Sequence, residues 1–182
     1  SILRDHKGLQ NTDLGLANEM TINQFIAHHS VIFQPEKRLM WVSTSPWQCG
    51  KYVAYDLNKI FKDTIDWQHE IYSSDLTIPE DKFIDTPEFQ HLLTYKKLTP
   101  LLLKKIRKKE QIEESVLKTY QASNPSLYYV YEVIGDYYEA MQQSKQAIAY
   151  WQQALKKSIP KLQEKERIQQ KIQKQSKDGK ES

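Results

Sequence analysis

Residues 30–61 read SVIFQPEKRLMWVSTSPWQCGKYVAYDLNKIF, and this stretch decides the fold. Three runs within it are rich in β-branched and aromatic residues, which favour strands: residues 30–33, 39–45 and 52–57. The turn-like residues 34–38 join the first two runs, and Pro46 ends the second because proline cannot donate to a strand ladder. We therefore expect an antiparallel β-meander.

The three runs carry apolar residues at consecutive positions, which is typical of a sheet covered on both faces. A layered sandwich is therefore expected in place of a sheet exposed to water. The chain also begins at Ser1, inside an apolar and charged stretch and without an initiator Met. We expect an upstream part to be missing, and one covering layer of the sheet with it.

After residue 61 the strand signals vanish, and residues 62–123 are expected to form a helical linker region that packs on the β-core. Thr86-Pro87 and Thr99-Pro100 each combine a hydroxyl cap with proline in a first helical turn. The sequence therefore predicts two helix starts in this region.

Residues 124–175 predict a tetratricopeptide-like helical hairpin followed by a capping helix, with a disordered tail at residues 176–182. Taking Gly135 as the small residue of the repeat, six further positions match its consensus: Tyr131, Ile134, Tyr138, Ala147, Trp151 and Ala154. Gly135 and Ala147 are expected to face one another, with the larger side chains around them. Two ordinary amphipathic helices are the alternative interpretation.

The groove-facing positions of the first repeat helix are predicted to be Tyr129, Glu132, Asp136 and Glu139. This surface is acidic, so it should repel a carboxylate ligand and accept a basic or aromatic peptide. An equally good alternative is that the groove is occupied by basic helices of the same chain, either residues 96–109 or the C-terminal tail.

The order of four motifs resembles the C-terminal part of a known family. The motifs are Leu3-Arg4-Asp5-His6-x-Gly8, Ser30-Val31-Ile32-Phe33, Leu39-Met40-Trp41-Val42-Ser43 with Pro46, and Tyr52-x-x-Tyr55-Asp56-Leu57. The family is the acyl-coenzyme A:6-aminopenicillanic acid acyltransferase and choloylglycine hydrolase group of N-terminal-nucleophile hydrolases. Residues 1–61 resemble its core, and the helical remainder resembles the extension of bacterial linear amide C-N hydrolases.

The resemblance implies an α+β chain that holds part of a four-layer αββα sandwich. In that family an autocatalytic cut exposes a Cys whose thiol attacks the amide carbonyl and whose α-amino group serves as base, without metal or organic cofactor. Those groups lie in the family's N-terminal half, so no residue here is assigned a catalytic role. We expect a fragment that is inactive alone and has the missing half as its partner. Bacterial periplasm, cell envelope and cytoplasm all stay open as its location.

A non-catalytic tetratricopeptide-type interaction module is the alternative function. A Cys-His nucleophile pair of Cys49 with His28 or His29 is disfavoured, because no helix start follows Cys49 to lower its pKa. The adjacent histidines would point to opposite sides of a strand, so a zinc site is not expected. His29 and Trp47 are the candidate substrate-binding residues.

The net charge of +3 hides a basic segment, because residues 96–109 hold seven Lys and Arg and no acidic residue. Solvated helix faces explain this pattern better than nucleic-acid binding, which we do not expect. No apolar run approaches the roughly 18 residues of a membrane helix, so no membrane span is expected. Trp41 and Trp67 are expected to fill the core.

Overall fold

A computed structural model describes residues 2–62 and 71–178 of the chain. The protein belongs to the α+β class, with a four-stranded antiparallel sheet and six α-helices in these residues. Two compact units divide the chain. The first holds residues 1–5 and 22–86, and the second holds residues 6–21 and 87–182.

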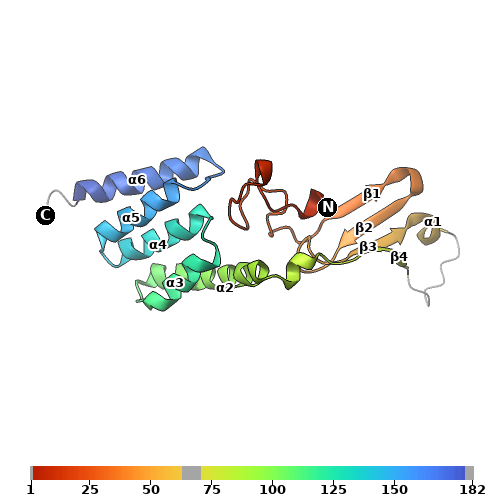
Figure 1. Cartoon of the computed structure of the whole chain (residues 1–182), viewed down its shortest axis with the longest axis horizontal. Coiled ribbons are helices and arrows are strands. Elements are labelled where there is room, and N and C mark those ends of the chain that lie inside the picture. The colour runs from red at the N-terminus through yellow and green to blue at the C-terminus, as the bar shows by residue number, and fades with distance from the viewer. Residues whose placement is uncertain (1, 63–70, 179–182) are drawn as a thin grey trace. The chain divides into compact units, whose positions relative to one another are not determined.

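The sheet of the first unit contains the three predicted strands and one more (Figure 1). Its strands are β1 (Val31–Gln34), β2 (Leu39–Ser43), β3 (Tyr52–Asp56) and β4 (Ser73–Ile78), in the order β1-β2-β3-β4. The meander is confirmed. Strand β4 lies within residues 62–123, where no strand was expected, and the expectation is wrong there because a largely polar segment pairs with the free edge of β3.

Short helices complete this unit. Helix α1 (Leu57–Ile60) follows β3 directly, and its first turn is capped by Asp56, whose carboxylate accepts from the Asn58 N–H at 3.0 Å. Four 3-10 helices occur in the described residues of the chain: Ile2–Arg4, Leu9–Asn11, Pro35–Lys37 and Lys82–Asp85. The predicted core residue Trp67 lies outside the described residues.

The strand register gives the sheet two very different faces. Cross-strand partners share a face, so Val31, Val42 and Val53 stand in one row. We call the face that carries this row the open face, and its side chains are Val31, Phe33, Met40, Val42, Val53 and Tyr55. None of these six side chains is buried, and Phe33 is 62% exposed. On the other face Tyr52 and Ala54 are buried.

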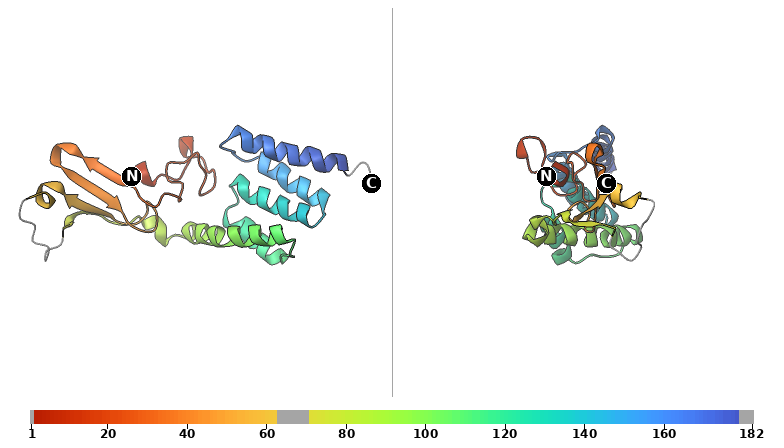
Figure 2. Two further views of the ribbon diagram at one scale, coloured as in Figure 1. Left: turned by 180° about the vertical axis from the view of Figure 1, so that it is seen from behind. Right: turned by 90° about the vertical axis from the view of Figure 1, so that its right-hand side faces the viewer.

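The second unit contains five helices that follow one another side by side (Figures 1 and 2). They are α2 (Pro87–Lys108), α3 (Glu114–Ser123), α4 (Tyr128–Ala140), α5 (Ser144–Leu155) and α6 (Leu162–Asp178). The described part of the chain has no helix that is long and apolar enough to cross a membrane, which agrees with the sequence-based expectation.

Two predicted helix boundaries are wrong. Pro100 lies inside α2 and starts no helix, and the Thr99 hydroxyl donates to the Tyr95 carbonyl at 2.8 Å within the same helix. Burial of Tyr95 and Leu102 on either side of the proline offsets its missing N–H bond. At the other end, the helix that was expected to end at residue 175 continues to Asp178, and residues 179–182 of the predicted tail lie outside the described residues.

The α4–α5 hairpin packs closely at Gly135. A Cβ at Gly135 would overlap the indole ring of Trp151, so this ring lies against the glycine, and the predicted contact between Gly135 and Ala147 stays a prediction. Tyr131, Ala147 and Ala154 are buried as expected of core positions. Tyr138 is only half-buried and stacks on Tyr150, with ring centroids 5.3 Å apart.

An N-terminal segment packs with the helices, although the sequence placed residues 1–61 in one β-core. We call residues 6–21 the strap. Gly15 has a φ of +81° and lies against the Leu127 backbone, where a side chain would overlap. The Asn124 amide accepts from Leu16 N–H at 3.0 Å and donates to Leu16 C=O at 2.7 Å. The chain therefore passes from one unit to the other after residues 5, 21 and 86.

Candidate functional site

The single thiol of the chain lies in a closed environment. Cys49 is 1% exposed, and its Sγ accepts a hydrogen bond from Asn23 Nδ2 at 3.5 Å. Burial raises the pKa of the Cys49 thiol, against the opposing effect of the Asn23 bond. A buried thiol kept in its protonated form is a poor nucleophile, which agrees with the sequence-based argument against Cys49 as a nucleophile.

Arg4 holds the loop that contains Cys49. Its Nε donates to Gln48 C=O at 3.1 Å, and its Nη2 donates to Gly50 C=O and to Pro79 C=O, both at 2.8 Å. The guanidinium also lies 5.4 Å from the centre of the Tyr52 ring. One side chain therefore donates hydrogen bonds to three backbone carbonyls and contacts one aromatic ring, so Arg4 is a structural residue of the unit. Sequence reasoning gave it no role.

The two candidate substrate-binding residues gain no assigned role from the geometry. His29 is exposed on the segment before β1. Trp47 is half-buried in the loop after Pro46, with a φ of 49° and its ring edge-on to Phe25 at a centroid distance of 6.1 Å. Their contact with substrate stays a prediction.

The predicted acidic face of α4 is paired with α6. The Arg167 guanidinium forms a fork on Glu132, with Nε donating to Oε1 at 3.0 Å and Nη2 donating to Oε2 at 2.9 Å. The Lys171 ammonium donates to Glu132 Oε1 at 2.9 Å and to Asp136 Oδ1 at 2.7 Å. The sequence left open whether this groove holds a peptide or basic helices of the same chain, and in the structure the C-terminal helix α6 lies against it.

Burial sets the electrostatics of this cluster. It raises the pKa of the Asp136 carboxyl, and the charge of Lys171 offsets only part of that effect. Burial also lowers the pKa of the Lys171 ammonium, but the bonds and charges of Asp136 and Glu132 outweigh it and leave the pKa above its ordinary value. Trp151 Nε1 donates to Asp136 Oδ1 at 2.9 Å, which fixes that carboxylate in place. The cluster therefore connects α4, α5 and α6.

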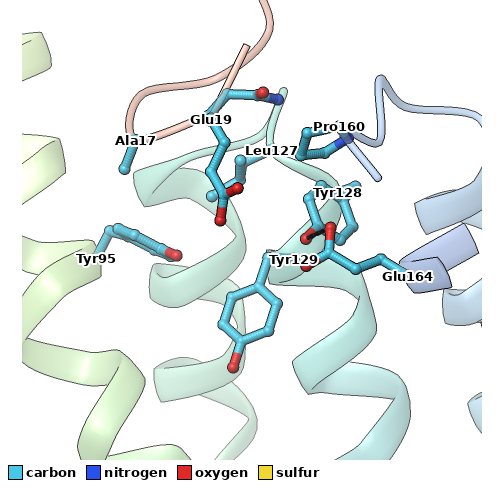
Figure 3. A pocket seen from close by; sticks show the side chains of 9 residues that line it. Ala17, Glu19, Tyr95, Leu127, Tyr128, Tyr129, Pro160 and Glu164 are labelled. Atoms are coloured by element: carbon cyan, nitrogen blue, oxygen red, sulfur yellow. Dashed lines mark hydrogen bonds between the residues drawn. The ribbon is translucent and has the colours of Figure 1, made fainter. Parts of the chain in front are cut away.

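A pocket of about 210 Å³ lies at the N-terminal end of α4 (Figure 3). It is lined by Ala17, Asn18 and Glu19 of the strap, Tyr95 of α2, Leu127, Tyr128 and Tyr129 at the start of α4, and Pro160 and Glu164 near the start of α6. Tyr128 donates from its hydroxyl to Glu164 Oε2 at 2.7 Å. We call this the tyrosine pocket. Of its residues only Tyr129 was predicted from the sequence to face a ligand groove.

A second cavity of about 470 Å³ lies at the other end of α4. It is lined by Ile106, Lys109, Asp136, Glu139, Ala140, Gln142 and Lys171. Its charges largely pair within the chain: Lys171 bonds Asp136, and Glu139 Oε1 accepts from Gln175 Nε2 at 3.2 Å. In residues 2–62 and 71–178 no group of three His, Cys, Asp or Glu residues is arranged to hold a metal ion.

We compared the chain with protein-family models, curated proteins and solved structures, and found no match in any of the three.

Proposed function

We propose that this chain is the C-terminal part of a cysteine N-terminal-nucleophile hydrolase or acyltransferase that acts on linear, non-peptide C-N bonds. The observation that carries the proposal is the open face of the sheet. The register places six largely apolar side chains on this face, and among the described residues none of them is fully buried: Val31 and Phe33 are exposed, and Met40, Val42, Val53 and Tyr55 are partly buried. Apolar surface of this kind marks an interaction site in a soluble protein.

Two stacked sheets are the arrangement that would cover this face. Sheets packed face to face lie about 10 Å apart and interdigitate apolar side chains. Because Phe33 is 62% exposed, covering it would stabilise an assembly by about 1–2 kcal/mol, and the neighbouring side chains on this face would add smaller amounts. The occupant proposed is the sheet of the nucleophile-bearing half of the same enzyme.

The state of Cys49 is compatible with this division of roles. The Cys49 thiol is buried, accepts a hydrogen bond from Asn23 and has a raised pKa. It is therefore not available to attack an amide carbonyl. The nucleophile is therefore supplied by the other half. The purified chain should release no amine from linear amide substrates, and Cys49→Ala should leave that result unchanged.

The partner is identified by native isolation of the chain from its source, followed by N-terminal sequencing of any polypeptide bound to it in equal amount. We expect that polypeptide to begin with Cys and to react with an amide-derived electrophile. Phe33→Asp, on the open face, should abolish the association. Ile26→Asp is the matched control, because Ile26 is 57% exposed in the same unit but lies outside the sheet.

A partner that lacks an N-terminal Cys would overturn the proposal, as would equal association of the two variants. Hydrolysis by the chain alone that is lost in Cys49→Ala would also overturn it, because the nucleophile would then be in this half.

A tetratricopeptide-type interaction module is the second candidate function. It is favoured by the helical unit, where α2, α4 and α6 line two cavities at opposite ends of α4. The predicted acidic groove is not available to a peptide along its whole length, because Arg167 and Lys171 already neutralise Glu132 and Asp136. A peptide of this kind would contact the ends of α4.

A further inference from the structure

We propose that the tyrosine pocket binds a small organic cation, either a guanidinium or a primary ammonium group, such as the head of an arginine or lysine side chain. The inference is independent of the hydrolase proposal. It deepens the interaction-module candidate, because it names the ligand chemistry and places it at one end of α4.

The walls of the pocket combine aromatic rings with carboxylates. Tyr95, Tyr128 and Tyr129 supply the rings, and Glu19 and Glu164 supply the negative charge. Figure 3 shows the Glu19 and Tyr95 side chains extending from different walls of the pocket. No Lys or Arg is among the lining residues. Ring faces and carboxylates both attract a cation, and the attraction increases when water is excluded.

The geometry also selects the type of cation. Glu164 Oε2 is bonded to the Tyr128 hydroxyl, which fixes the orientation of this carboxylate before any ligand arrives. Burial and this bond raise the pKa of Tyr128, so its phenol stays protonated and continues to donate. Carboxylate oxygens accept hydrogen bonds from N–H donors, which guanidinium and primary ammonium groups have and quaternary ammonium groups lack.

The volume limits the size of the ligand. A cavity of about 210 Å³ is smaller than the roughly 300–1,000 Å³ of a pocket for a drug-sized molecule. A single side chain or a small amine fits it. The bulk of a larger ligand would remain outside, above the strap and the start of α6.

One cation of the chain lies near the rim. Lys161 pairs with Glu19, but the two side chains are 54% and 43% exposed. Exposed pairs contribute little to stability, so a ligand cation can share or replace this contact. Arg167, on α6, is bonded to the buried Glu132, and its charge also acts on Glu164 and Tyr128 of the pocket.

The test titrates the full chain with capped arginine, N-acetyl-arginine amide, and follows backbone amide shifts by NMR. Capped citrulline, which is neutral and nearly the same shape, is the ligand control. Arginine should produce saturable shifts at the pocket, and citrulline should not. This comparison needs no variant, so it stands even if a substitution disturbs folding.

Glu164→Gln and Glu19→Gln should each weaken binding of capped arginine at least about fivefold, because each removes a charge-assisted contact. Glu166→Gln is the matched control on the exposed side of α6 and should leave binding unchanged. A flexible peptide with one central arginine shows whether the natural ligand is a protein side chain or a small free cation. If the peptide binds more tightly than capped arginine, the ligand is a protein segment. If the two bind equally, the ligand is a small free cation.

Equal binding of arginine and citrulline would overturn the proposal, as would the same loss in Glu166→Gln as in Glu164→Gln. Absence of binding by both arginine ligands would also overturn it. None of these results bears on the open face of the sheet, which is tested separately with Phe33→Asp.

Discussion

Glu132 is a buried charged residue of the helical unit that is paired with two cations. Its side chain is 3% exposed and receives bonds from Arg167 and Lys171. The sequence identified Glu132 as part of an acidic face but could not reveal its partners, because Arg167 lies 35 residues away and its pairing depends on how α6 packs. Local patterns indicate which face is charged, whereas tertiary packing decides what pairs with it.

Glu132→Gln should destabilise the unit by about 2–4 kcal/mol, because Arg167 and Lys171 lose a charged partner inside the structure. Urea unfolding followed by circular dichroism measures this loss. Glu114→Gln, which breaks the fully exposed Glu114–Lys118 pair on α3, is the control and should leave the unfolding midpoint unchanged. Equal effects of the two variants would contradict the assigned burial of Glu132.

Gly135→Ala tests the close approach of α4 and α5. The added Cβ would overlap the buried indole of Trp151, and overpacking of this kind costs about 1–3 kcal/mol. The better helix propensity of alanine, about 1 kcal/mol, does not offset it. Thermal unfolding should show a lower midpoint for Gly135→Ala and no decrease for Gln146→Ala, at an exposed position of α5.

The helices and strands with strong local sequence patterns were predicted, whereas the strand that forms only by pairing with a neighbouring strand was not. Strands β1, β2 and β3 follow from runs of β-branched and aromatic residues, and the α4–α5 hairpin follows from helical spacing. Strand β4 has a polar sequence and exists because β3 offers it an unpaired edge. The tyrosine pocket was missed for a related reason, since its residues come from four separate segments.

Helix α6 is an integral part of the helical unit, and Ile168 is its buried contact. Ile168→Ala should lower the free energy of unfolding by about 2–4 kcal/mol, because it leaves a cavity beside α5. Gln169→Ala, at the adjacent exposed position, should have little effect. An unchanged free energy of unfolding in Ile168→Ala would contradict the claim that packing of α6 on α5 stabilises the unit.

At the scale of the whole molecule, the sequence predicted the α+β class and the change from strands to helices. It did not predict that the strap belongs with the helices, because residues 6–21 carry only loop signals and their position is fixed by Asn124 and Leu127.

The buried tyrosines predict how stability depends on alkaline pH. Burial raises the pKa of Tyr95, Tyr120 and Tyr128 above the ordinary value of 10.0. These phenols stay protonated in the folded state but ionise near pH 10 when unfolded, so their stabilising contribution is complete below that pH and is lost above it. The urea midpoint should fall above about pH 10, and less steeply in Tyr120→Phe. Ionisation of all tyrosines near pH 10 in the folded protein, followed by absorbance, would contradict this.

Oxidative labelling of Met40 tests the central claim most directly, namely that the open face is an internal packing surface. Met40 lies on that face, and Met20, 55% exposed on the strap, is the internal reference. Mass spectrometry would compare the isolated chain with the assembly isolated from its source. We predict that Met40 is labelled readily in the isolated chain and protected in the assembly, while Met20 shows no comparable protection. Equal labelling of Met40 in both samples would contradict the account.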